Sequence, residues 1–211
     1  GVGSSSATWS TVMDRLGDRY PVAAFDLLGH GDSPTPDDPD LFSRDAALAD
    51  IDDVMAELEV PTVLVGHSLG GYLALAHAAT RFGSAPGLVV LNTGPGFRDE
   101  VKRKAWNERS RRNAHRFGVA PQAAEINLQH DGVVMEHLAE IEAPTLVLAG
   151  TDDRAEYSGA GQYLARKMVD CRFVAVEGGE HAMHESTHAD EIAELIDRFV
   201  LERVLPQKPS G

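Results

Sequence analysis

The sequence predicts an α/β fold with a mostly parallel sheet that helices cover on both faces, and two observations predict it. Short runs that are apolar throughout recur along the chain, as in parallel strands buried on both faces. Between these runs lie stretches whose apolar residues are spaced three and four apart, which is typical of amphipathic helices. The apolar runs are residues 62–65, 88–91, 144–150 and 172–176.

The remaining elements follow from local patterns. Residues 22–25 predict a short strand that ends at Asp26, and residues 29–33 predict a turn that His30 helps to hold. Ser43 is a typical N-cap residue. The helix that it caps has one apolar face formed by Leu48, Ile51, Met55 and Leu58. Further helices are predicted at 72–81 and 159–168, and the last helix has a stripe formed by Ile192, Leu195, Ile196 and Phe199.

Ser68 lies in the pentapeptide Gly66-His67-Ser68-Leu69-Gly70, between an apolar run and a helix-like stretch. A serine at a tight strand–turn–helix connection is exposed and strained, as a nucleophile must be. We expect Gly66 and Gly70 to be required because side chains at these positions would collide in the turn. The alternative is an ordinary glycine-rich turn.

A nucleophilic serine requires a base, an acid and an oxyanion hole. Asp152 and Asp153 directly follow the run 144–150, and His181 follows the run 172–176. Because the carboxyl ends of parallel strands meet at one edge of a sheet, we expect these residues to lie near Ser68.

Four motifs carry a resemblance to the α/β-hydrolase superfamily over residues 1–204. They are the glycine-rich turn around Ser68, the segment 26–33, the segment Gly150-Thr151-Asp152-Asp153, and Gly179-Glu180-His181 followed by Glu185. The chain resembles a single-domain serine esterase-like member with a short lid. The resemblance implies that Ser68 is the nucleophile, His181 the general base and Asp153 the acid that orients it. Asp153 is preferred to Asp152 because the family places its acid three residues after the glycine, and His184 and His188 are expected to be surface or packing residues.

The resemblance also implies an oxyanion hole formed by the backbone N–H groups of Leu69 and Val2. Leu69 follows the nucleophile at a helix N-terminus, where the dipole favours negative charge. The family places two or three strands before the loop that contains Val2. We therefore expect such strands to precede Gly1; strands supplied from elsewhere and a nonfunctional fragment are the alternatives.

The expected organisation is a first core part at 1–93, a short helical lid at 94–143, a second core part at 144–204 and a tail at 205–211. The lid contains a basic segment, 98–116, with eight basic and three acidic side chains. This net charge of +5 could attract an anionic substrate, or the segment could be a solvated helix face on an acidic body. Trp106 and Phe97 either line an acyl pocket or anchor the lid helix, and His130 is expected to be part of the lid structure.

Composition limits the other possibilities. A chain of 211 residues with 43% hydrophobic residues predicts one domain with a full core. Its net charge of −14 argues against nucleic-acid binding, and no run reaches the ~18 apolar residues of a membrane helix. The chain has a single cysteine, Cys171, which excludes an internal disulfide. No motif indicates a metal or other cofactor. We expect a cytoplasmic protein, with secretion and oligomeric state left open.

The resemblance places the chemistry with acyl transfer, because relatives that open epoxides or displace halides have aspartate in place of Ser68. The sequence therefore predicts a serine hydrolase that cleaves a small carboxylic ester, lactone or thioester through an acyl-enzyme. Carbon–carbon bond hydrolysis and cofactor-free perhydrolysis are alternatives with the same three residues. A non-catalytic relative that binds a small ligand is an alternative of another class.

Overall fold

A computed structural model of the chain describes residues 1–205, and a four-stranded parallel sheet forms its centre. The strand order is β1-β2-β3-β4, with Val65 opposite Val89 and Val90 opposite Val147. The strands are β1 (Leu64–His67), β2 (Leu88–Leu91), β3 (Thr145–Gly150) and β4 (Cys171–Val176). The predicted parallel sheet is confirmed, and each strand begins within two residues of its predicted start.

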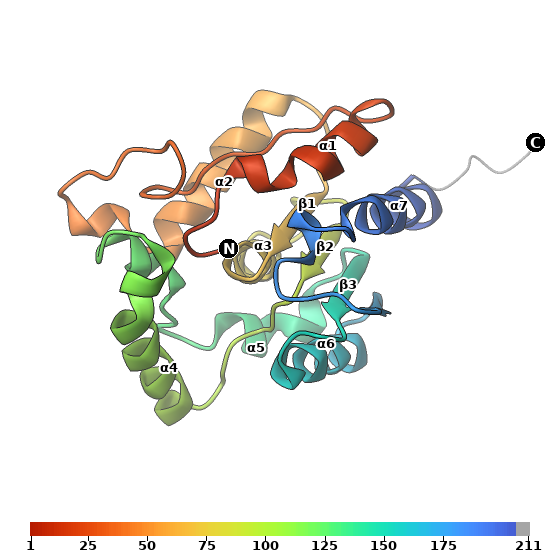
Figure 1. Cartoon of the computed structure of the whole chain (residues 1–211). Coiled ribbons are helices and arrows are strands. Elements are labelled where there is room, and N and C mark those ends of the chain that lie inside the picture. The colour runs from red at the N-terminus through yellow and green to blue at the C-terminus, as the bar shows by residue number, and fades with distance from the viewer. Residues whose placement is uncertain (206–211) are drawn as a thin grey trace, which may run out of the picture.

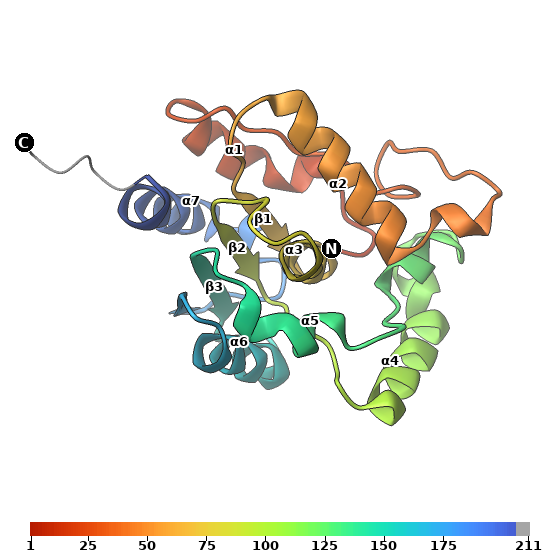
Figure 2. The same ribbon diagram turned by 180° about the vertical axis from the view of Figure 1, so that it is seen from behind.

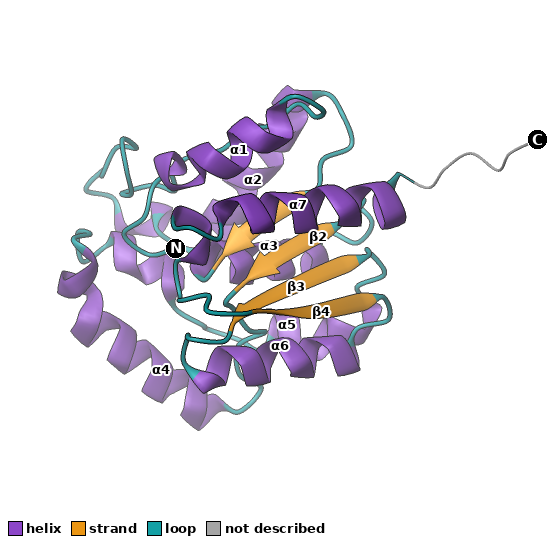
Figure 3. Ribbon diagram, turned by 45° about the vertical axis from the view of Figure 1, so that its right-hand side comes forward, coloured by secondary structure: helices purple, strands orange, loops and turns teal. Residues whose placement is uncertain are grey.

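Helices cover both faces of this sheet because successive strand side chains point to opposite sides. Leu88 and Val90 pack with α2, α3 and α6, whereas Val89 and Leu91 pack with α1 and α7. Figure 3 shows α7 lying across one face, with α3 behind the strands and α6 below them. The helices are α1 (Ser10–Gly17), α2 (Arg44–Leu58), α3 (Leu69–Thr80), α4 (Glu100–Asn113), α5 (Val133–His137), α6 (Ala155–Lys167) and α7 (Ala189–Phe199).

The predicted helices form for the expected reasons. The Ser43 hydroxyl accepts a hydrogen bond from the Ala46 N–H at 3.1 Å and so caps α2. In α7 the side chains of Ile192, Ile196 and Phe199 are buried, which confirms the apolar stripe. Helix α1 was not predicted.

One strand prediction is wrong. Residues 22–25 form an extended segment that is not part of the sheet within residues 1–205. A strand requires a hydrogen-bonded neighbour, and this segment makes no ladder with one. The local alternation of Val22 and Ala24, half-buried, with the exposed Phe25 is nevertheless strand-like.

The turn after this segment is held by Asp26. Its carboxylate accepts backbone N–H groups of Ser6 and Asp32, and these bonds lower the pKa of the carboxyl. The buried His30 has its Nδ1 3.1 Å from the carbonyl oxygen of Leu28. His30 therefore contributes to the turn, as predicted.

The predicted lid region contains α4 and α5. Figure 1 and the reverse view in Figure 2 both show α4 set apart from the sheet, whereas the N-terminus lies beside α3. No residue of α4 is buried. The domain boundaries remain a prediction, and the predicted tail lies outside the described residues apart from Leu205. Within residues 1–205, none of the helices has the length and apolar character needed to span a membrane.

Candidate active site

Ser68 connects the end of β1 to the start of α3 in a strained conformation. Its φ of 51° and ψ of −112° lie where a residue with a side chain is uncommon, at a cost of roughly 1–3 kcal/mol. Three hydrogen bonds hold it there. The Ser68 N–H donates to the Leu91 carbonyl at 2.9 Å, and its own carbonyl accepts from the Thr93 hydroxyl at 2.7 Å and the Tyr72 N–H at 3.0 Å. The turn therefore presents the Ser68 hydroxyl at the carboxyl edge of the sheet.

The glycines of this turn have different roles. A side chain at Gly66 would collide with the backbone of Gly70 and Gly71, so Gly66 is required as predicted. The expectation for Gly70 is wrong, because a Cβ there would meet nothing within 4 Å. The backbone of Gly70 lies close to Gly66, but a Cβ on Gly70 itself would point into open space. Gly71 is the second constrained position, since a Cβ there would press on Thr93.

His181 and Asp153 come together with Ser68. The Nε2 atom of His181 lies 3.2 Å from the Ser68 hydroxyl oxygen, and its Nδ1 atom lies 2.7 Å from Oδ2 of Asp153. The three side chains form one hydrogen-bonded chain from the hydroxyl to the carboxylate. This is the geometry by which a base activates a serine and an acid orients the base.

Asp153 and Asp152 differ in their surroundings. The side chain of Asp153 is only 4% exposed, and its second oxygen accepts the Arg154 N–H at 2.7 Å. Asp152 is exposed and lies 3.3 Å from the Thr151 hydroxyl. The structure thus brings Asp153, and not its neighbour, to the histidine.

Asn92, at the end of β2, links the loops that carry these residues and was not predicted from the sequence. Its Nδ2 donates to the carbonyl oxygens of Glu180 at 3.0 Å and His181 at 2.7 Å. Its Oδ1 accepts the Gly150 N–H at 2.9 Å. Asn92 has a φ of 45°, a conformation that asparagine tolerates better than most residues. The available signal was a polar residue directly after an apolar strand, at the same sheet edge as Ser68.

A family model described as "Alpha/beta hydrolase family" matches residues 1–195 of the chain. The chain belongs to the alpha/beta hydrolase family. The predicted resemblance and fold are therefore confirmed, and a hydrolase is the general class of protein to which the chain belongs.

This alpha/beta hydrolase is similar to proteins that are named for different activities. It is 32% identical over 168 residues to 2-succinyl-6-hydroxy-2,4-cyclohexadiene-1-carboxylate synthase of Enterobacter sp. (strain 638), covering 76% of this chain and 61% of that relative. It is 28% identical to a pimeloyl-(acyl-carrier protein) methyl ester esterase of Neisseria meningitidis, covering 100% of this chain and 77% of that relative. A solved esterase from Thermogutta terrifontis with bound malate shares the fold, with a TM-score of 0.78 at 20% identity over 97% of this chain and 88% of that chain.

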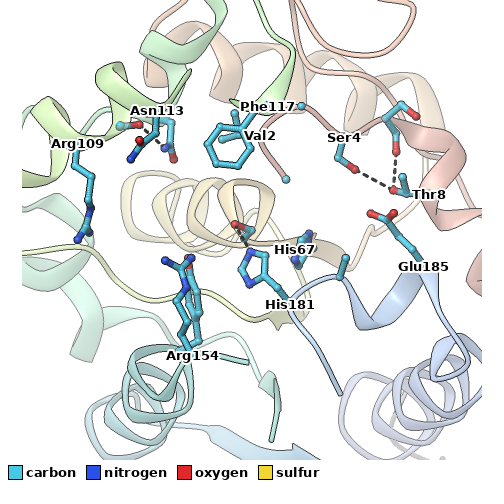
Figure 4. A pocket seen from close by; sticks show the side chains of 18 of the residues that line it. Val2, Ser4, Thr8, His67, Arg109, Asn113, Phe117, Arg154, His181 and Glu185 are labelled. Carbon is cyan, nitrogen blue, oxygen red and sulfur yellow. Dashed lines mark hydrogen bonds between the residues drawn. The ribbon is translucent and has the colours of Figure 1, made fainter. Parts of the chain in front are cut away.

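The two predicted oxyanion donors lie at the same site. Leu69 is the first residue of α3, where the N–H groups of the first turn have no acceptor within the helix. Val2 lines the pocket that also contains Ser68 and His181. Figure 4 shows Val2 beside Phe117 at this pocket. Their role as donors to an oxyanion stays a prediction.

A cluster of buried aromatic rings lies behind His181 in this hydrolase. The ring of His67 is 4.8 Å from that of His181 and 4.4 Å from that of His184, which in turn lies 4.3 Å from Trp9. Within the described residues, the ring nitrogens of His67 and His184 have no hydrogen-bond partner. Burial lowers the pKa of His67 well below its ordinary value and that of His184 to about 3. His184 is therefore neutral, and its 3.6 Å approach to Glu185 is not an ion pair.

The predicted competitors of His181 are thus packing or surface residues. His184 is fully buried against Trp9. His188 is half-buried, with its Nε2 3.0 Å from the Glu177 carbonyl oxygen. Neither residue contacts Ser68.

The pocket beside Ser68 has a volume of about 460 Å³. Trp106 of α4, in the predicted lid, lines it, and its indole N–H donates to the Asn127 carbonyl at 3.2 Å. Phe97 packs on Trp106 with ring centroids 6.0 Å apart and is not part of the lining. His130 is exposed and lies outside the pocket. Trp106 therefore both anchors α4 and faces the pocket. Within residues 1–205, no group of three or more His, Cys, Asp or Glu side chains could hold a metal ion.

Proposed function

We propose that this chain is a serine hydrolase that cleaves a small carboxylic ester, lactone or thioester through an acyl-enzyme on Ser68. The observation that carries the proposal is the continuous hydrogen-bonded chain from Ser68 through His181 to Asp153, at 3.2 and 2.7 Å. The strained turn that presents Ser68 adds to it, because such strain is typical of functional residues.

Each residue has a defined step in the mechanism. His181 Nε2 accepts the Ser68 proton as the hydroxyl oxygen attacks the substrate carbonyl carbon. Asp153 holds the imidazole in the tautomer that makes Nε2 the acceptor, and stabilises the cation that forms. The N–H groups of Leu69 and Val2 would donate to the oxyanion.

Collapse of the tetrahedral intermediate breaks the bond to the leaving group, which takes the proton from His181. Water then attacks the acyl-enzyme, with His181 again accepting a proton, and Ser68 is released with the carboxylic acid product. The pocket volume, about 460 Å³, fits a small acyl substrate.

Membership of the family supports hydrolase chemistry but does not indicate which type of bond is cleaved. The Neisseria relative is named as a methyl ester esterase, and the Enterobacter relative is named as a synthase. The hydrogen-bonded chain from Ser68 through His181 to Asp153 favours acyl transfer. Carbon–carbon cleavage and perhydrolysis would use the same three residues, and analysis of products across a substrate panel separates them.

The test compares wild type with Ser68→Ala on 4-nitrophenyl butyrate, and we expect a loss in kcat on the order of 10⁴-fold or more. Ser84→Ala is the matched control, because Ser84 bonds the Arg81 carbonyl at the far end of α3. A fluorophosphonate should label wild type at Ser68 and leave the Ser68→Ala protein unlabelled. Equal rates in the two proteins, or labelling at another residue, would contradict the proposal.

A further inference from the structure

The pocket beside Ser68 is asymmetric in charge. Arg109 from α4 and Arg154, at the N-cap of α6, both line it. Figure 4 shows these two side chains on one side of His181 and Glu185 on the other. The pocket therefore has a cationic end and an anionic end, with the proposed nucleophile between them.

Neither guanidinium at the cationic end is neutralised by the protein. Within residues 1–205, no carboxylate oxygen lies within 4.0 Å of the guanidinium nitrogens of Arg109 or Arg154, and each guanidinium instead lies over an aromatic ring. Arg109 stands 5.0 Å above the centroid of Trp106, and Arg154 stands 5.1 Å above that of Tyr157. Two other cations of segment 98–116 do have carboxylate partners: Arg111 pairs with Glu125 through two bonds of 2.8 Å, and Lys104 pairs with Glu100 at 2.7 Å.

Arg154 lies close to the reacting groups. The Tyr157 ring stacks on His181 with centroids 4.7 Å apart, and Arg154 donates to the Tyr157 hydroxyl at 3.1 Å. Burial raises the pKa of Tyr157, and the charges of Arg154 and Arg109 both oppose that rise. The two guanidinium groups thus act on one phenol beside the proposed base. An anion between them would relieve their mutual repulsion and use the planar forks that bind carboxylates.

We infer that the substrate carries a free carboxylate, bound by Arg109 and Arg154, in addition to the acyl carbon attacked by Ser68. The substrate class is a half-ester or related monoacyl derivative of a small dicarboxylic acid. This inference rests on the proposed function for the reacting bond, and the binding of the carboxylate is independent of turnover.

The aromatic supports fit this role. Trp106 and Tyr157 hold the arginine side chains through cation–π contacts and leave their N–H edges available. Asn113, which also lines this part of the pocket, supplies a neutral donor beside Arg109 (Figure 4). Glu185, at the opposite end, would repel a carboxylate and so favours one orientation of the substrate.

The kinetic experiment compares mono-4-nitrophenyl adipate with an uncharged analogue that keeps the 4-nitrophenyl ester and has a carboxamide in place of the free carboxylate. Spontaneous hydrolysis is subtracted from both rates. We expect wild type to favour the anionic ester in kcat/KM by about tenfold or more, and Arg109→Gln or Arg154→Gln to lose most of that preference. Both variants should lose much less activity on the uncharged analogue than on the anionic ester. Arg112→Gln is the matched control, because Arg112 is exposed on the same helix and does not line the pocket.

A second arm measures binding without chemistry. Monomethyl adipate and dimethyl adipate are titrated into the Ser68→Ala protein by calorimetry, and only the anionic ligand should bind with an affinity that Arg109→Gln lowers. If the anionic ligand binds but wild type does not hydrolyse the ester, the proposed hydrolase activity is contradicted and the carboxylate site is supported. Turnover without any preference for the anionic ligand would overturn the carboxylate site and leave the hydrolase intact. Equal losses for charged and uncharged substrates in the glutamine variants would likewise overturn it, because they indicate a structural role only.

Discussion

The side-chain amide of Asn92 donates a hydrogen bond of 2.7 Å to the backbone carbonyl of His181. The same side chain accepts the Gly150 N–H at 2.9 Å, at the end of the strand that precedes Asp153. One buried residue at the end of β2 therefore fixes the loops on β3 and β4 relative to each other. The distance between the proposed acid and base depends on it.

Loss of this side chain should damage catalysis more than a surface change of the same size. For Asn92→Gly, which accepts the positive φ, we expect kcat to fall by about a hundredfold because the imidazole is misplaced. Unfolding free energy should fall by roughly 1–3 kcal/mol, since buried backbone groups lose their partners. The measurements are ester kinetics and urea unfolding. A variant that loses stability but keeps the wild-type kcat when folded would show that Asn92 is structural only.

Asp153→Asn tests the assignment of the acid. The amide would favour the wrong imidazole tautomer, so kcat should fall by a factor on the order of 10⁴. Asp152→Asn is the control, because Asp152 is the adjacent exposed carboxylate with no contact to His181. We expect that variant to stay within about twofold of wild type, since exposed substitutions perturb little. A larger loss for Asp152→Asn than for Asp153→Asn would reverse the assignment.

The glycine pair in the serine turn gives a prediction about stability. Gly66→Ala should destabilise by about 3 kcal/mol or more, because its Cβ would press on the Gly70 backbone and no flexible side chain can yield. Gly70→Ala should be neutral or stabilising by up to about 1 kcal/mol, since Gly70 lies in α3 with open space around it. Chemical unfolding of both variants measures the difference. Equal destabilisation by the two would contradict the geometry of the turn.

The sequence predicted the residues whose positions follow from strand ends, and missed those whose positions depend on the path of the backbone. Ser68, Asp153 and His181 could be placed because each lies within five residues of the end of an apolar run, and parallel strands bring such positions to one edge. The choice of Asp153 over Asp152 came from the family resemblance. Asn92 has the same placement, but a single polar residue after a strand carries no signature of what its amide reaches. The prediction of a strand at 22–25 was wrong because a strand also needs a hydrogen-bonded neighbouring strand, which the local sequence does not reveal. The prediction that Gly70 is required was wrong because a clash depends on the direction of the Cβ, which the spacing of the glycines does not reveal.

The pocket residues Arg109 and Arg154 illustrate the same limit. They are 45 positions apart in sequence. The net charge of segment 98–116 was compatible with attraction of an anion or with a solvated helix face, and it did not distinguish arginines that are paired with a carboxylate from those that are not. Only the contacts do so, since Arg111 meets Glu125 whereas Arg109 lies over Trp106.

The buried histidine behind the site should make stability depend on pH. Burial lowers the pKa of His184 from its ordinary value of 6.5 to about 3, so the unfolded chain binds a proton that the folded chain excludes. The stability from a neutral His184 is therefore fully present above pH 6.5 and is lost as the pH falls toward 3. The buried His67, whose pKa is also lowered by burial, adds a loss of the same sign.

His184→Phe tests this linkage, because phenylalanine can keep the contacts with Trp9 and His67 but does not titrate. Below pH 6.5, the fall in unfolding free energy should be shallower in the variant by on the order of 1 kcal/mol per pH unit. Urea unfolding is followed from pH 7 down to about 4.5, and carboxylate titration, which begins near the lower limit, is common to both proteins and cancels in the difference. Parallel curves for wild type and variant would show that His184 becomes protonated in the folded protein, against the pKa that its burial implies.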